Sequence, residues 1–447
     1  MMKKYTLIIV VWFMHAGVFA QASTAKLDEL LSAYANQNKF NGTALVAQKG
    51  KVLLEKGYGF KDANLQTKND VNTIFQVGSI TKQFTAALIL YLQEKKKLSI
   101  QDKLGKYFPS FPNADKITIE HLLTHTSGIY SYTNDSKFMI NEITHPKTRD
   151  SMMALFQDKP LNFNPGSKWS YSNSGYSMLG YIIEKVANRP YEQMMRDIVF
   201  KPLKMDRSGF DFTHLSSVDK AVGYLTFDEK NKAVAPIVDS SISYSAGAIY
   251  STVGDLHKWE RSLFGNRLLK QESWKMAFTP FLNKYGYGWS MDTLFDKQVM
   301  AHGGGIHGFN SNLFRILQDE IVIILLNNKN NPHLSEITKG LAAIVLDKNY
   351  EMPKERVSLT VNDSLLKTYV GEYELTPAFK IIVRLENGLL KGQATGQPEF
   401  TLFGEKEGVF VLKVVEAKVE FFKGADGKVD KMILYQNGAV IPGKKIK

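Results

Sequence analysis

The spacing of apolar positions near the start of the chain predicts a helix followed by a strand pair. Between residues 25 and 35 apolar side chains recur every three or four positions, as on one face of a helix. Residues 42–57 predict a β-hairpin, with strands at Thr43–Ala47 and Val52–Leu54 around a turn at Gln48–Lys51.

A mainly helical pattern then extends to about residue 280, and strand-like patterns return after it. The clearest helical segments are Ile119–Thr124, Ser177–Ala187 and Thr252–Leu263. The late segments are two strands, Phe309–Leu317 and Glu320–Leu326, and a helix, Leu334–Leu346. The simplest architecture is an α+β fold, in which both ends of this region supply one antiparallel sheet flanked by helices, with an all-helical insertion between them.

The composition changes near Glu351–Pro353, where a second domain is expected to begin. From there the chain consists of short alternating segments with frequent glycines, such as Phe379–Leu385, Gly388–Gly392 and Val419–Phe422. This spacing is typical of a small all-β sandwich or barrel. We therefore expect a first domain over residues 21–352 and a second over residues 353–447.

The first twenty residues have the pattern of a secretory signal peptide. Lys3 and Lys4 precede an apolar run, and Val18-Phe19-Ala20 resembles a cleavage site, so cleavage is expected near Ala20. The alternative is an N-terminal membrane anchor, for which the run is short. The 447 residues include no cysteine, which excludes disulfides and thiol chemistry and fits a large bacterial protein that is periplasmic or secreted.

The formal net charge is +12, but the basic residues are spread along the chain. No basic run is interleaved with aromatic residues, so the charge favours acidic surfaces or anionic substrates over nucleic acid. No later apolar run is long enough to cross a membrane.

Ser79 and Lys82 are the first candidates for chemistry. They lie three residues apart ahead of an apolar run, and positions i and i+3 share one face of a helix. A serine hydroxyl needs a neighbouring base to become a nucleophile, and a lysine can be that base when its pKa is lowered. The free N–H groups at the helix N-terminus suit a developing oxyanion. The alternative is that Ser79 only caps a helix.

Tyr171 and Asn173 form the second candidate pair, after the turn at Asn164–Gly166. Residues two apart on an extended segment project to the same side, so the phenol and the amide would lie on the same side of this segment. A phenol near a cation such as Lys82 can act as a base, and the amide can bind both Lys82 and a substrate carbonyl. The alternative is a loop tyrosine packed on the core.

The third candidate is the run from His302 through Gly303, Gly304 and Gly305. Glycines beside a strand permit close approach of a substrate backbone, and Gly305 can supply a second oxyanion donor. His302 would lie at the edge as a polar or cationic contact to the substrate. A plain β-turn is the alternative. The run is not a phosphate loop, since it lacks the Lys-Ser/Thr pair.

Together these segments resemble the serine β-lactamase and penicillin-binding protein superfamily, in its class C-like branch. Ser79-Ile80-Thr81-Lys82 matches the Ser-x-x-Lys motif, Tyr171-Ser172-Asn173 the Tyr-x-Asn motif, and His302-Gly303-Gly304 stands where the family has Lys-Thr-Gly or His-x-Gly. The segments His121–Gly128 and Ser245–Gly247 also resemble the family. The resemblance covers residues 25–350 and implies a β-lactamase/transpeptidase-like fold.

The resemblance implies acyl transfer through an acyl-enzyme on Ser79. Lys82 and Tyr171 would share the role of base, and which of them takes the first proton stays open. Asn173, His302 and the glycines Gly303 to Gly305 would bind the substrate. No metal or organic cofactor is implied, and His121, His125, His302 and His307 form no recognisable zinc motif.

One departure from the family pattern bears on the substrate. The third motif begins with His302 instead of lysine and has Gly303 in place of a hydroxyl residue. A neutral histidine gives up a charge-assisted contact to a substrate carboxylate, worth about 1.5–3 kcal/mol. The pattern is more similar to D-peptidases, of DD-carboxypeptidase or D-aminopeptidase type, and to esterases.

We therefore expect a secreted serine hydrolase whose partner is a small molecule or peptide: a peptidoglycan stem, a D-amino-acid peptide, an ester or a β-lactam. Two alternatives are a class C-type β-lactamase and a non-catalytic penicillin-binding protein that senses or binds the cell wall. Neither nucleic acid nor a membrane span after signal removal is expected, and the sequence leaves the oligomeric state open.

Overall fold

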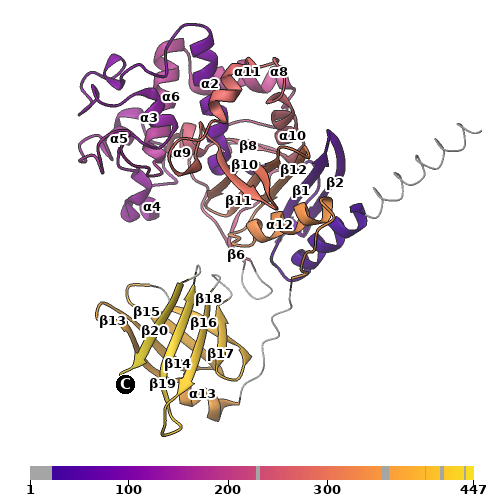
Figure 1. The fold of residues 1–447 in the computed structure, drawn as a ribbon, viewed down its shortest axis with the longest axis vertical. Helices are drawn as coiled ribbons and strands as arrows, with labels where there is room; N and C mark the ends of the chain where they lie inside the picture. Colours follow the sequence, from indigo (N-terminus) through magenta and orange to yellow (C-terminus); the bar gives the residue numbers. More distant parts are fainter. Residues whose placement is uncertain (1–22, 228–231, 354–361, 398, 413–416, 437–438) are drawn as a thin grey trace, which may run out of the picture. The chain divides into compact units, whose positions relative to one another are not determined.

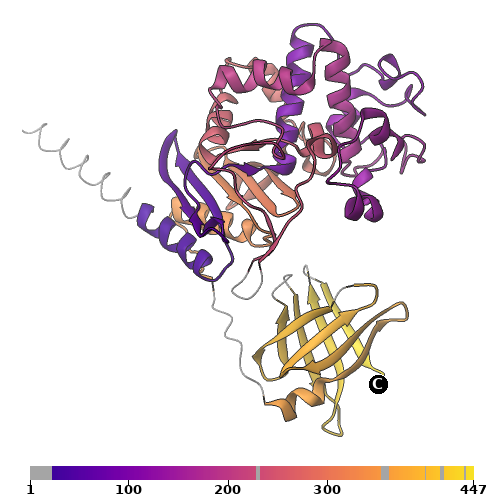
Figure 2. The same ribbon diagram turned by 180° about the vertical axis from the view of Figure 1, so that it is seen from behind.

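The computed structural model describes residues 23–227, 232–353, 362–397, 399–412, 417–436 and 439–447. The chain divides into two compact units, Met1–Pro353 and Lys354–Lys447 (Figures 1 and 2). The expected signal peptide, residues 1–20, lies outside the described residues. Within the described ranges, no helix is both long and apolar enough to span a bilayer.

The first unit contains a six-stranded antiparallel sheet with the strand order β2-β1-β12-β11-β10-β9. The strands, in that order, are Lys51–Tyr58, Gly42–Gln48, Ile321–Asn327, Phe309–Ile316, Lys297–Ile306 and Ser290–Leu294. β1 pairs directly with β12, so the two ends of the unit meet at the middle of the sheet (Figure 1). The predicted antiparallel sheet made from both ends is therefore confirmed. The run from His302 to Gly305 lies inside β10, so the alternative of a plain turn is wrong.

The sheet is covered on both faces. In β12, Ile321, Ile323 and Leu325 face a core that also holds apolar residues of the 23–36 helix and of α12 (Leu334–Val345). Their neighbours Val322, Ile324 and Leu326 face the larger core on the opposite side. Alternate residues of a strand point to opposite faces, so a strand buried on both sides is apolar throughout its length.

The region between β5 (Phe75–Gln76) and β9 is the predicted insertion, but it is mainly helical instead of all-helical, because it also holds short strands. Its α-helices are α2 (Thr81–Glu94), α3 (Ile119–Leu123), α4 (Ser136–Asn141), α5 (Arg149–Ala154), α6 (Asn173–Ala187), α7 (Tyr191–Met195), α8 (Lys201–Leu203), α9 (Ser240–Gly247), α10 (Val253–Ser262) and α11 (Gln271–Ala277). The π-helical segment Arg196–Phe200 joins α7 to α8, and short 3-10 helices lie at η1 (Gly78–Ile80), η2 (Leu104–Lys106), η3 (Tyr132–Asn134) and η5 (Leu282–Lys284). Minor strand pairs are β3 (Phe60–Asp62) with β4 (Thr67–Lys68), β5 (Phe75–Gln76) with β8 (Tyr250–Ser251), and β6 (Tyr224–Phe227) with β7 (Lys232–Val234).

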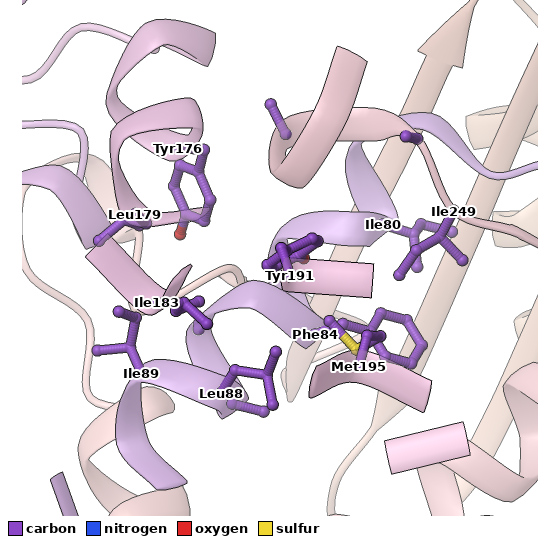
Figure 3. Packing of buried hydrophobic residues seen from close by; sticks show 14 of the residues in the cluster. Ile80, Phe84, Leu88, Ile89, Tyr176, Leu179, Ile183, Tyr191, Met195 and Ile249 are labelled. Atoms are coloured by element: carbon purple, nitrogen blue, oxygen red, sulfur yellow. The ribbon is translucent and has the colours of Figure 1, made fainter. Parts of the chain in front are cut away.

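Helix α2 is buried around nearly its whole circumference. Figure 3 shows Phe84 and Leu88 of α2 packed among Leu179 and Ile183 of α6 and residues of α7. Burial of each such side chain contributes about 1.5–3 kcal/mol. This packing fixes the N-terminal end of α2, which carries the Ser-x-x-Lys segment.

The second unit is a closed eight-stranded barrel preceded by helix α13 (Asp363–Tyr369). Its strands are β13 (Gly371–Thr376), β14 (Phe379–Glu386), β15 (Leu389–Ala394), β16 (Glu399–Lys406), β17 (Val409–Leu412), β18 (Ala417–Lys423), β19 (Val429–Gln436) and β20 (Ala439–Lys445). The predicted small all-β domain is confirmed, and of its two forms the barrel is the one found. Helix α13 and strands β16 and β20 were not predicted.

Candidate active site

Ser79 and Lys82 are joined at the start of α2. Ser79 lies in the 3-10 turn η1, and Lys82 is the second residue of the α-helix that continues from it. The Lys82 Nζ atom lies 3.0 Å from the Ser79 Oγ atom. Ser79 therefore does not act as a side-chain cap of this helix, for which the structure records no capping bond.

The Lys82 amine makes two further hydrogen bonds, and both acceptors are carbonyl oxygens. It donates to the Asn173 Oδ1 atom at 2.8 Å and to the main-chain oxygen of Ala246 at 2.7 Å. The side chain is fully buried. Burial disfavours the charged form and lowers the pKa of the Lys82 ammonium well below its usual value.

Asn173 is held by its own hydrogen bonds at the start of α6. Its backbone N–H donates to Ser131 Oγ at 3.1 Å, and its Nδ2 donates to Thr133 Oγ1 at 3.1 Å. The second bond orients the amide so that Oδ1 faces Lys82. The helix is capped by Ser172, whose hydroxyl accepts from the Gly175 N–H, and so begins at Asn173 instead of the predicted Ser177. The expectation that Tyr171 and Asn173 share one extended segment is therefore wrong, because that segment ends at Ser172.

Tyr171 nevertheless lies against the lysine. The Lys82 Nζ atom is 4.8 Å from the centre of the Tyr171 ring, and the ring of His125 lies 4.2 Å from the Tyr171 ring between centroids. Burial raises the pKa of Tyr171 above its usual value, and the neighbouring Ser79 hydroxyl only partly offsets this rise. The phenol is therefore neutral at pH 7.

His302 lies beside Tyr171, with 6.3 Å between the ring centroids, and is only 6% exposed. Its Nδ1 atom lies 2.6 Å from the Gly303 oxygen and its Nε2 atom 2.8 Å from the Tyr285 hydroxyl. Because the carbonyl can only accept, Nδ1 carries the proton and Nε2 accepts from Tyr285. Burial, together with the nearby Lys82 charge, lowers the pKa of His302 to about 4. The imidazole is neutral at pH 7 and does not line the cavity described below.

The glycines of β10 pass close to the segment that carries Ser79. A Cβ atom on Gly304 would lie 2.0 Å from the Val77 oxygen and 2.3 Å from Ser311 Oγ. A Cβ atom on Gly78, whose φ is +51°, would lie 2.9 Å from the Gly305 nitrogen. Only glycine fits Gly78 and Gly304 without movement, so the absence of side chains here sets the spacing between Ser79 and β10.

Replacement of Gly304 by alanine should separate these two segments. We expect kcat/KM to fall by about 100-fold, because displacement of catalytic groups by about 1 Å has that effect. The overpacked contact should also lower the free energy of unfolding by about 1–3 kcal/mol, measured by chemical denaturation. The matched control is Gly303→Ala, whose Cβ atom would meet nothing closer than 3.7 Å and should fit without strain. Equal activity of the two variants would contradict a functional role for the close approach between Gly304 and Val77.

A cavity of about 440 Å³ opens beside Ser79. Ser79, Asn173 and Gly305 line it, whereas Tyr171, His302, Gly303 and Gly304 do not. The structure thus brings Ser79, Lys82, Tyr171 and Asn173 together, places Gly305 at the cavity wall, and places His302 beside Tyr171. Nowhere in the described ranges do three or more His, Cys, Asp or Glu side chains gather so as to hold a metal ion.

Sequence reasoning missed several groups that hold this arrangement. The carbonyl of Ala246 and the hydroxyls of Ser131 and Thr133 lie on segments without a motif of their own for this role. The closest signals were the family-like segments around His125 and Ala246, to which no function was assigned. Tyr285, the partner of His302, carried no signal.

Tyr244 is an unexpected feature of the site. It interrupts α9 with φ 38° and ψ −133°, a conformation that bulky residues rarely adopt. Its ring is stacked on Tyr181, 5.1 Å away between centroids. Directly after it, the carbonyls of Ser245 and Ala246 accept from Thr85 Oγ1 and Lys82 Nζ in α2. The strained turn thus directs two successive carbonyls at the helix that carries the lysine.

The sheet, the helical insertion and the Ser-x-x-Lys segment define a protein of the serine β-lactamase and penicillin-binding protein superfamily. The chain belongs to the β-lactamase family, because the family model described as Beta-lactamase matches residues 27–347. It is a serine hydrolase of this family. Residues 355–444 match a second family model, described as "Domain of unknown function (DUF3471)".

Individual relatives agree with this assignment. "Penicillin-binding protein 4*" of Bacillus subtilis (strain 168) is 28% identical over 439 residues, which cover 92% of this chain and 96% of the relative. PbpX of the same strain is 34% identical over 324 residues, 72% of this chain and 79% of the relative. The solved structure of a D-stereospecific amidohydrolase from Streptomyces sp. aligns with a TM-score of 0.62 at 26% identity, covering 73% of this chain and 99% of that one.

Proposed function

We propose that the protein cleaves D-amino-acid amides, peptides or small esters through an acyl-enzyme on Ser79. The observation that carries this proposal is the 3.0 Å contact between the Ser79 hydroxyl and the Lys82 amine, which is buried and has a lowered pKa. The D-stereospecific amidohydrolase among the similar structures supports a substrate of this class.

Lys82 is the group that takes the first proton in this proposal. A neutral amine has two N–H groups and one lone pair, and the two carbonyl oxygens of Asn173 and Ala246 can only accept. With both N–H groups engaged there, the lone pair faces the Ser79 hydroxyl. Tyr171 has a raised pKa and keeps its proton, which makes it a poor first base.

The proton balance of the reaction follows from this assignment. The Ser79 proton moves to Lys82 while Oγ attacks the substrate carbonyl and forms a tetrahedral intermediate. Collapse of the intermediate breaks the bond to the leaving group, which receives a proton from Tyr171 as the phenol is reprotonated from Lys82. Water then attacks the acyl-enzyme and gives its proton to the neutral Lys82 amine. Collapse of the second tetrahedral intermediate breaks the bond to Ser79 Oγ, which takes the proton back from Lys82, and releases the carboxylic acid product.

The oxyanion is assigned to the backbone N–H groups of Ser79 and Gly305. Both residues line the cavity, and the close approach of Gly78 to the Gly305 nitrogen puts η1 beside β10. Donors fixed in this way stabilise the negative charge that develops on the carbonyl oxygen. Asn173 would contact the substrate from the opposite wall.

The neutral state of His302 argues against efficient β-lactamase activity, which stays the alternative function. A buried imidazole with a pKa of about 4 offers no positive charge to a substrate carboxylate at pH 7. The other alternative is a non-catalytic penicillin-binding protein or cell-wall sensor, and the contact between Ser79 and Lys82 disfavours it. We also propose a periplasmic or secreted location, supported by residues 1–20 and by the bacterial penicillin-binding relatives.

Covalent labelling tests the proposal. Incubation with a fluorophosphonate should add one adduct, and peptide mapping by mass spectrometry should locate it on Ser79. A panel of a D-aminoacyl anilide, a D-Ala-D-Ala peptide, a nitrophenyl ester and a cephalosporin then ranks the substrate classes. An adduct on another residue, or none, would reject the proposal, and fastest turnover of the cephalosporin would favour the β-lactamase alternative.

A further inference from the structure

The cavity beside Ser79 has an apolar wall built from four separate parts of the chain. Met139 comes from α4, Leu225 from β6, and Ile306 from the end of β10. Val238, just before α9, and Ile242, inside α9, complete the wall and are 3% and 1% exposed. The Tyr132 hydroxyl, in η3, donates to the Ile242 oxygen at 2.8 Å and so ties η3 to α9.

The described residues that line the same cavity include no charged side chain. Among the described residues that line it, none is Asp, Glu, Lys or Arg, and its polar members are hydroxyls, amides and one histidine. That histidine, His307, is half-buried, and burial lowers its pKa from the usual value. Lys82 is enclosed behind Ser79 and lies outside the lining. An ionised group entering this space would lose its hydration without gaining an ion-pair partner.

The position of the cavity relative to the reacting groups identifies which half of the substrate it holds. Asn173 lines the cavity, whereas Tyr171, the proposed donor to the leaving group, does not. The leaving group must lie on the Tyr171 side of Ser79, which leaves the cavity to the acyl group. A volume of about 440 Å³ falls within the size range of small-molecule sites, roughly 300–1,000 Å³.

We propose that this cavity receives an uncharged, apolar acyl group, so that among the substrates of the proposed function hydrophobic neutral esters and amides are preferred over D-aminoacyl amides with a free ammonium, and those with a carboxylate in the acyl part are rejected. This inference rests on the proposed role of Ser79. It adds a substrate class that the assignment to the family does not supply, since it follows from the residues of this wall.

Nitrophenyl esters with matched acyl groups test the inference. From acetate through butanoate to hexanoate we expect kcat/KM to rise by about fourfold per methylene, which is about 0.8 kcal/mol per buried CH2 converted at 1.36 kcal/mol per tenfold. The adipate monoester replaces the terminal methyl of hexanoate by a carboxylate and should be at least about tenfold slower than hexanoate. Release of nitrophenol, including any initial burst, is measured for each.

A charge placed on the wall provides the second measurement. Leu225 is 38% exposed, so Leu225→Arg should fold, and it should shift the adipate-to-hexanoate ratio at least about tenfold toward adipate. The control is Leu65→Arg, at a leucine that is 77% exposed and does not line the cavity. This control should leave the ratio unchanged.

The outcomes separate the inference from the proposed function. If adipate is hydrolysed as fast as hexanoate, or the acyl series is flat, while the fluorophosphonate adduct forms on Ser79, the inference is wrong and the proposed function stands. If no ester reacts and no adduct forms, the proposed function itself fails. An unchanged ratio in Leu225→Arg, with activity retained, would also overturn the inference.

Discussion

Replacement of Ser79 by alanine is expected to abolish covalent labelling and to lower kcat/KM by about 10,000-fold or more. Without the hydroxyl no acyl-enzyme can form, and only binding and the oxyanion donors remain to assist attack by water. The change removes one oxygen atom from a short 3-10 turn, so the fold should be retained. The measurement is steady-state kinetics with the best ester of the panel, together with fluorophosphonate labelling.

The control for this variant is Ser216→Ala, at an exposed serine outside the cavity. Its labelling and kcat/KM should match those of the unchanged protein. Labelling that persists in Ser79→Ala at full stoichiometry would place the nucleophile elsewhere and remove the basis of the proposed mechanism.

Replacement of Lys82 by methionine is expected to lower kcat/KM by about 100- to 10,000-fold, the usual contribution of a general base. The side chain keeps its length, but the lone pair that faces the Ser79 hydroxyl is lost. The effect should lie in acylation, which burst kinetics resolve as slower release of the first equivalent of nitrophenol. Thermal unfolding separates this loss from a folding defect, since the carbonyls of Asn173 and Ala246 lose their donor, which costs about 1–3 kcal/mol each.

The pH profile distinguishes Lys82 from Tyr171 as the first base. Protonation of the lysine fills its lone pair, so kcat/KM should fall as the pH drops through the lysine pKa. Because burial lowers that pKa, the plateau should extend well below the usual range of a lysine. In Lys82→Met this acidic limb should disappear from the residual rate. A limb that persists unchanged in the variant would assign it to another group.

Much of the first unit's fold could be predicted because the buried residues of its strands and helices recur at regular spacings in the sequence. The apolar run Ile321–Leu326 and the hairpin at residues 42–57 are long enough to define strands without tertiary information. In the second unit, β20 was missed because Pro442 and Gly443 argue against a strand in the sequence. Closure of the barrel depends on the pairing of β13 with β20, which no local pattern encodes.

The parts of the site that are formed by side chains could be predicted from the sequence. The parts that are formed by backbone atoms could not. The spacing of Ser79 and Lys82 expresses helix geometry directly, whereas the carbonyl of Ala246 contacts the lysine through a main-chain atom that every residue possesses. The start of α6 at Asn173 was missed because the polar stretch before Ser177 lacks an apolar period. The buried position of His302 includes a bond to Tyr285, which lies 17 residues earlier in the chain and outside the His302 motif.

The pairing of β1 with β12 has a consequence for how the first unit forms. Asn41 donates its backbone N–H to the side chain of Asn327, and these residues are 286 positions apart in the chain. The β1–β12 pair therefore cannot assemble until nearly the whole unit has been synthesised, and contacts of such sequence separation form slowly. During that interval the edge of β1 that later pairs with β12 stays open to other chains, so early termination before Ile321 should leave an aggregation-prone fragment without a completed sheet.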